Sequence, residues 1–123
     1  MQWIRIAALL GGLSVVIGAF GAHGLKDRLA ETGYASQFET GVQYHAIHAL
    51  ALLAVGILAL MKGDEMRGLG LAGWSFIVGT LLFSGSLYAL AVTGVTKLGA
   101  ITPLGGLAFI LGWGALFWGA LKR

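Results

Sequence analysis

Long uncharged stretches, separated by short charged clusters, dominate the hydrophobic and polar pattern of this chain. Four such stretches each hold at least ~20 residues, the length that a helix needs to cross a hydrocarbon core of ~30 Å. A helix of a water-soluble bundle carries a polar face, and these stretches have none. The pattern therefore predicts four transmembrane helices, in the stretches Arg5 to Lys26, Glu39 to Lys62, Arg67 to Lys97, and Lys97 to Lys122.

Turn and cap residues predict where these helices end. The segment LKDRLAE, after the first stretch, indicates a short extra helix, and Gly33 is placed to end it in a left-handed conformation. Thr102 followed by Pro103 is typical of an N-cap with proline at the first helical position. We expect an all-α integral membrane four-helix bundle, a single transmembrane domain over residues 1–123, with helices at about 3–22, 40–61, 69–92 and 103–121.

Composition narrows the class of protein further. The chain is 58% hydrophobic and 11% charged, where a soluble domain carries roughly a quarter charged residues. Its net charge of +3 lies in loops and ends, without a basic patch interleaved with aromatics, so we expect no nucleic-acid partner. The absence of cysteine excludes disulfides, thiolate chemistry and cysteine-based metal sites. The expected surroundings are the lipid bilayer.

The positive charges near the helix ends predict the orientation. Five lie on the side of the termini, against three on the other side: Arg5, Lys62, Arg67, Lys122 and Arg123 against Lys26, Arg28 and Lys97. This bias predicts that both termini are cytoplasmic.

The two halves of the chain resemble each other. At an offset of 61 positions they align without a gap and share thirteen identities, where this composition gives about six by chance. The segment LAETG, for example, aligns with LAVTG. The alignment suggests two duplicated helical hairpins related by a pseudo-twofold axis along the membrane normal. Repeats of this kind often place a binding site at their interface.

Polar side chains gather at one depth of the predicted bundle. Tyr44, His45 and His48 recur at helical spacing on the second helix, His45 and His48 roughly 8 to 12 Å below its start. Because ionisable groups at membrane depth are costly, they usually mark a functional site. The third helix, which runs the other way, brings serines and a tyrosine to a similar depth. The candidate ligand-binding residues, in the extracytoplasmic leaflet, are His23, Glu39, Tyr44, His45, His48, Ser84, Ser86 and Tyr88.

Three interpretations of this cluster are open. It can be a hydrogen-bonded network that holds helices together, at ~0.6 kcal/mol for each bond. It can line a pocket for a small polar ligand or a lipid headgroup. It can also be a metal site, in which His45 and His48 bind zinc or copper with Glu39 or His23 as a third ligand. The sequence does not decide whether a metal binds.

Signals for catalysis are weak. Asp27 and Glu31 lie in a connection and read as solvated charges, and Ser84 and Ser86 have no GxSxG context. We therefore expect a protein that is not an enzyme and that uses no cofactor.

Four motifs together resemble a known family. They are GAFGAHGLK, the F-x-x-G-V-Q-Y-H-x-x-H-A stretch, LFSGSLY and ITPLGG. In combination they resemble the small bacterial membrane proteins grouped as domain of unknown function 423, which have a eukaryotic transmembrane relative. The resemblance implies a four-helix protein of the bacterial inner membrane and carries no established activity. The family pattern falls on Gly21, His23, Gly24, Phe38, Gly41, Tyr44, His48, Ser84, Gly85, Tyr88, Pro103 and Gly105.

The leading hypothesis from the sequence is a protein related to small-ligand or lipid binding or transport, acting through the polar cluster. One alternative is a structural or assembly factor that packs against another membrane protein, and another is a metal-binding membrane protein. With four spans, an enclosed pathway requires an oligomer, so a homo-oligomer is expected for a transporter. The ligand itself is not predicted.

Overall fold

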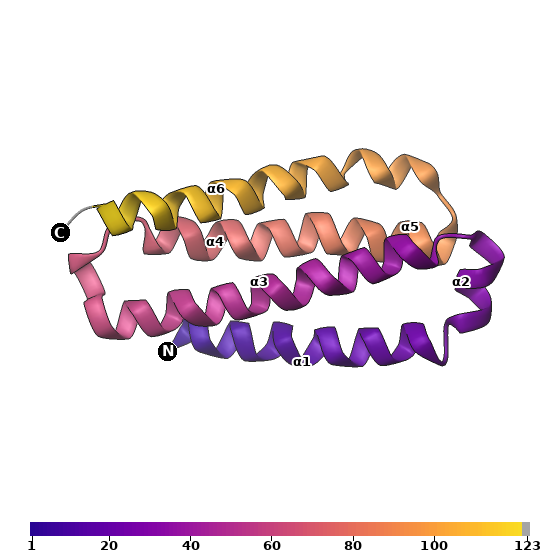
Figure 1. The fold of residues 1–123 in the computed structure, drawn as a ribbon, viewed down its shortest axis with the longest axis horizontal. Helices are drawn as coiled ribbons and strands as arrows, with labels where there is room; N and C mark the ends of the chain where they lie inside the picture. The colour runs from indigo at the N-terminus through magenta and orange to yellow at the C-terminus, as the bar shows by residue number, and fades with distance from the viewer. Residues whose placement is uncertain (122–123) are drawn as a thin grey trace.

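The computed structural model describes residues 1–121 and is helical throughout, without strands in that part of the chain (Figure 1). Four helices in it are long and apolar enough to cross a membrane, which confirms the predicted membrane fold. The elements are α1 Gln2–Ala22, α2 Lys26–Thr32, α3 Ala35–Lys62, η1 Gly63–Glu65, α4 Leu69–Gly79, η2 Thr80–Ser84, α5 Gly85–Thr93, η3 Thr96–Ala100 and α6 Thr102–Leu121. The elements α4, η2 and α5 form one continuous span.

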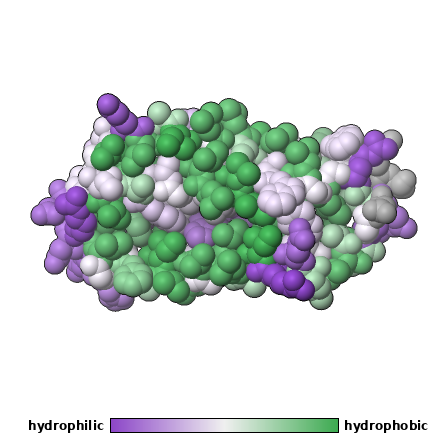
Figure 2. All heavy atoms as spheres, turned by 180° about the vertical axis from the view of Figure 1, so that it is seen from behind, coloured by the Kyte–Doolittle hydropathy of each residue, from purple (hydrophilic) through white to green (hydrophobic). Residues whose placement is uncertain are grey.

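The surface has the polarity of a membrane protein. Figure 2 shows apolar side chains in a band across the molecule and hydrophilic side chains mostly towards its two ends. Large side chains such as Val15, Leu50, Ile110 and Phe117 are more than 60% exposed within this band. That exposure is unfavourable in water and matches hydrocarbon.

Two glycine turns join the helices at one end of the molecule. Gly33 ends α2 with φ 80° and Gly94 ends α5 with φ 77°, and each N–H donates to the carbonyl four residues earlier. Only glycine adopts this left-handed conformation without strain. The left-handed end predicted for Gly33 is confirmed. Helix α3 begins at Ala35, five residues before the expected Thr40, because the turn at Gly33 is complete within two residues.

The closest packing lies within each half of the chain, between α1 and α3 and between α4 and α6. Aromatic rings of one helix rest on glycines of its neighbour, as in the pairs Phe76–Gly112 and Phe109–Gly79. Small residues let membrane helices approach in this way. Helix α1 is peripheral, since only Ala7 and Ser14 of its 21 residues are buried. The pseudo-twofold rotation between the halves stays a prediction.

A single π-helical turn, η2, interrupts the third span at Thr80–Ser84. Such a turn inserts a residue into the helix and changes the face that the following residues present. Phe76, before the turn, packs against α6, whereas Ser84 and Tyr88, at its end and beyond, contact α3. The span as a whole contacts both neighbours, since Phe76 also lies against His48 of α3 and Ser86 lies against Thr102 of α6.

Candidate functional site

Both ring nitrogens of His48 are hydrogen-bonded, Nε2 to α6 and Nδ1 within α3. Its Nε2 lies 3.0 Å from the indole Nε1 of Trp113, and its Nδ1 lies 2.7 Å from the Tyr44 carbonyl oxygen. An indole N–H only donates and a carbonyl only accepts, so Nε2 is the acceptor and Nδ1 carries the proton. The ring also stacks on Phe109, with centroids 3.5 Å apart. This neutral imidazole has no nitrogen left for a metal or a ligand.

His45 is turned towards α5. Its Nδ1 lies 2.7 Å from the Tyr88 hydroxyl, while its buried Nε2 has no partner, the one such side-chain atom among the described residues. His45 and His48 therefore serve different helix contacts and do not point into one shared site.

The serines of the third span make further hydrogen bonds. Together with those of His45 and His48, we call them the buried network. Ser84, fully buried, donates to the Gly41 carbonyl of α3 over 2.7 Å. Ser86 donates to the Phe83 carbonyl, and the Thr102 hydroxyl lies 2.5 Å from the Ser86 oxygen. Thr102 is already the first residue of α6, so it ties two spans together where the sequence suggested a cap.

Replacing Ser84 by alanine tests this cohesion. The change removes the hydrogen bond to Gly41, and we expect a loss of ~0.6 to 1.7 kcal/mol in unfolding free energy. Thermal unfolding in detergent measures it. The matched control is Ser14→Ala, because Ser14 is also buried but donates only to Gly11 of its own helix. Equal losses for both variants would contradict a role of Ser84 between helices.

Of the remaining candidates, Tyr44 contributes its backbone carbonyl to this network, and its ring centroid lies 6.1 Å from that of His48. Tyr44 is 39% exposed, with its ring 4.8 Å from that of Phe83. His23 is exposed at the end of α1, and Glu39 is exposed on α3. Within residues 1–121, no three His, Asp or Glu side chains gather as a metal site would require. The structure thus gives the metal hypothesis no support, and it places in side-chain hydrogen bonds within the bundle five of the eight candidates, His45, His48, Ser84, Ser86 and Tyr88.

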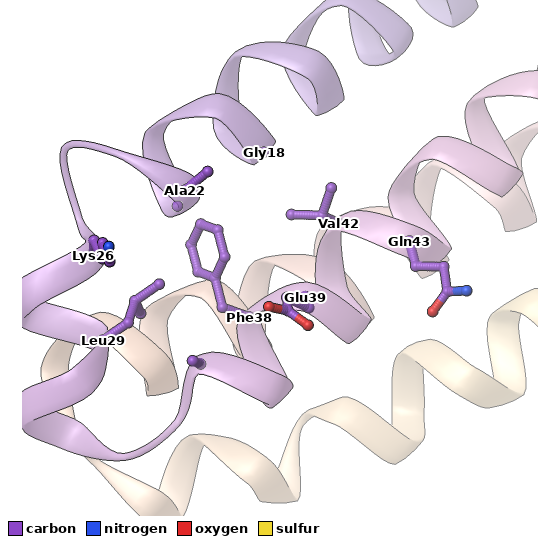
Figure 3. Close-up of a pocket in the computed structure, with 10 residues that line it drawn as sticks. Gly18, Ala22, Lys26, Leu29, Phe38, Glu39, Val42 and Gln43 are labelled. Carbon is purple, nitrogen blue, oxygen red and sulfur yellow. The ribbon is translucent and has the colours of Figure 1, made fainter.

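An open groove lies between α1 and α3 and is covered at its end by α2 (Figure 3). Its volume is about 580 Å³. Its walls are small and apolar because α1 presents glycine and alanine there, and its mouth carries one ammonium, one carboxylate and one amide. We call it the α1–α3 groove; it is lined by Gly18, Gly21, Ala22, Lys26, Leu29, Ala35, Phe38, Glu39, Val42 and Gln43.

A second, apolar hollow of about 370 Å³ lies on the same seam. Its lining begins about one helical turn beyond the α1–α3 groove, at Val15 on α1 and Ala46 on α3, and reaches Ala7 and Leu53. From Ala22 to Ala7 the two hollows follow α1 for fifteen residues, or ~22 Å. One leaflet of hydrocarbon is ~15 Å thick, half the bilayer core. Together the hollows are long enough for an acyl chain.

Helix α2 is fixed above the groove by contacts with the end of α5. Arg28 Nε donates to the Val92 carbonyl over 2.7 Å, and the Thr32 hydroxyl donates to the Ala91 carbonyl over 2.8 Å. Arg28 also pairs with Glu31 at 3.0 Å. The last carbonyls of a helix lack partners within it, so these side chains cap α5 and hold α2 in place.

Comparison with known proteins assigns the chain to a family. The model of a protein family of unknown function, DUF423, matches residues 17–106. The chain belongs to the DUF423 family. A UPF0382 membrane protein of Bacillus subtilis, YwdK, is 47% identical over 123 residues, covering 98% of this chain and 96% of that protein. UPF0382 membrane proteins of Staphylococcus epidermidis and Haemophilus influenzae are 45% and 40% identical, each covering 98% of this chain and 95% and 94% of their own length. No solved structure matches.

The family and the names of its relatives agree with the predicted membrane protein of unknown function. Sequence reasoning missed several residues at the sites described above. Trp113 and Phe109 have no signal beyond their place on the fourth span. The α1–α3 groove does have a signal in the sequence. Gly18, Gly21 and Ala22 recur on one face of the first helix, between two segments that carry charge.

Proposed function

We propose that this DUF423 protein is a non-enzymatic, lipid-binding protein of the inner membrane, with the α1–α3 groove as its site. The observation that carries the proposal is the groove's shape, apolar along its length and polar at its mouth. Helix α3 has 28 residues, a length of ~42 Å that fits a bilayer with its headgroup layers. Glu39, four residues below the start of α3, therefore lies ~6 Å down, near the boundary of headgroups and hydrocarbon.

The buried network supports this function indirectly. Most of its polar side chains are hydrogen-bonded within the protein, so the polar cluster predicted as a ligand site is better suited to hold α3 in position. Helix α3 supplies half of the groove lining, including Phe38 and Glu39. With both termini cytoplasmic, as the charge bias predicts, the mouth faces the outer leaflet. Residues 122–123, which carry two of the five charges behind that bias, lie outside the described residues.

Filling the groove tests the proposal. Ala22→Leu places a larger side chain on the wall, and we expect lipid retention to fall about tenfold, as displacing two methylenes at ~0.8 kcal/mol each would give. Native mass spectrometry of gently extracted protein measures bound lipid and subunit number together. The control is Ala19→Leu, since Ala19 is exposed on the same helix and does not line the groove. Retention unchanged by Ala22→Leu, or absent from the wild type, would reject this site.

The second candidate function is an assembly factor. The peripheral position of α1, with two buried residues, favours it, because a helix of a partner or of a second copy could pack on the free side of α1. In the same spectrum, a stable oligomer without lipid, dissociated by substitutions on α1, would favour this function over lipid binding.

A further inference from the structure

The mouth of the α1–α3 groove carries both signs of charge on opposite walls. Lys26 comes from α2 and Glu39 from α3, as Figure 3 shows, and Gln43 lies one turn further along α3. A groove for an anionic lipid requires only the cation, and a groove for an uncharged chain requires neither. The presence of both charges at the mouth therefore favours a headgroup that itself carries both a negative and a positive charge.

Lys26 and Glu39 do not form a salt bridge with each other. Among the described side chains the one ion pair joins Arg28 to Glu31, and neither Lys26 nor Glu39 has a charged partner within the distance of a salt bridge. Both are exposed at the end of the molecule. A lysine ammonium suits a phosphate, and a carboxylate suits a cation.

We infer that the groove selects a zwitterionic phospholipid whose headgroup ends in a primary ammonium. Lys26 binds the phosphate, and Glu39, with the amide oxygen of Gln43, accepts hydrogen bonds from the ammonium. The glyceride chains follow the small residues of α1 towards the second hollow. This inference rests on the proposed lipid-binding function and names its ligand class.

The chemistry distinguishes this headgroup from its two nearest relatives. A trimethylammonium group has a positive charge but no N–H, so it cannot donate to Glu39. A glycerol headgroup leaves the phosphate negative and places no cation beside the carboxylate, which then repels it. The expected order of retention is phosphatidylethanolamine first, then phosphatidylcholine, then phosphatidylglycerol.

The test uses the full chain in nanodiscs that contain these three lipids in equal amounts, with identical acyl chains, and counts the lipids kept on release into a mass spectrometer. We expect the wild type to keep phosphatidylethanolamine about threefold to fivefold over phosphatidylcholine, the scale of an exposed charged contact. Glu39→Gln is expected to remove most of that preference. Lys26→Gln is expected to lower the retention of all three phospholipids.

Matched controls keep the charge change and move it away from the groove. Glu65→Gln accompanies Glu39→Gln, and Lys97→Gln accompanies Lys26→Gln, since Glu65 and Lys97 are exposed and do not line the groove. Equal retention of the three lipids, or a preference that survives Glu39→Gln, overturns the headgroup assignment. Either result leaves the proposed lipid binding in the groove unaffected. A wild type that keeps no lipid removes the proposed function itself. Ala22→Leu separates the two, because it lowers total retention and leaves the ratio of lipids unchanged.

Discussion

Gly105→Ala is expected to destabilise the protein by about 3 kcal/mol or more, the upper range for overpacking a core. A Cβ at position 105 would overlap the backbone nitrogen of Phe83 and come within 2.7 Å of its Cα. Backbone atoms of η2 and α6 touch there, and a backbone cannot rotate away as a side chain can. The two spans would have to separate, which also disturbs the neighbouring contact between Phe109 and Gly79.

The next residue is the natural control. A Cβ at Gly106 would meet its nearest neighbour, a ring carbon of Phe83, at 3.9 Å, an ordinary contact. Thermal unfolding in detergent should place Gly106→Ala near the wild type and Gly105→Ala about 10 °C lower, if each kcal/mol shifts the midpoint by about 3 to 4 °C. Two variants of equal stability would show that α6 does not approach η2 this closely.

His48→Leu is expected to cost about 1 to 3 kcal/mol of unfolding free energy, chiefly because the Trp113 N–H would lose its acceptor. Leucine fills a similar volume but accepts no hydrogen bond and cannot stack on Phe109 as a flat ring does. Because the loss lies between α3 and α6, it should weaken the fold before it changes any binding at the α1–α3 groove.

A double-mutant cycle separates the hydrogen bond from the packing. Trp113→Phe alone leaves His48 without a donor. The double variant, His48→Leu with Trp113→Phe, removes both the donor and the acceptor, so neither is left unpaired. We expect a coupling energy of ~0.6 to 1.7 kcal/mol between the two positions, from unfolding measured in one detergent. Strict additivity would mean that the contact of 3.0 Å contributes no stability.

Much of the fold could be predicted because its causes are local in the sequence. Uncharged length determines a span, and a glycine after a short polar helix determines a left-handed turn, as at Gly33. The π-turn at Thr80–Ser84 could not be predicted, since Phe83 and its neighbours read as ordinary helix. It depends on how closely α6 can approach, through Gly105.

The residues of the buried polar cluster could be listed from the sequence, but their hydrogen-bond partners could not. Helical spacing placed His45 and His48 near one depth, and the structure keeps them there. Spacing alone could not show that the two rings turn to different helices, because that depends on Tyr88 and Trp113, 43 and 65 residues away. The groove was missed for a related reason. The groove forms where α1 has glycine and alanine in place of larger side chains. Glycines in a membrane helix usually indicate close packing of helices.

The two Thr-Gly turns also bear on the history of the chain. Thr32 and Thr93 each receive a hydrogen bond from the backbone N–H two residues later, so the turns are built alike. Only the first copy has Arg28, whose counterpart 61 positions on is Ala89, and only its threonine reaches the opposite helix. A protein assembled from two identical halves would have lacked this one-sided clasp. The predicted duplication is therefore not exact at this contact, because only the first half ties the short helix beside the groove to the opposite span.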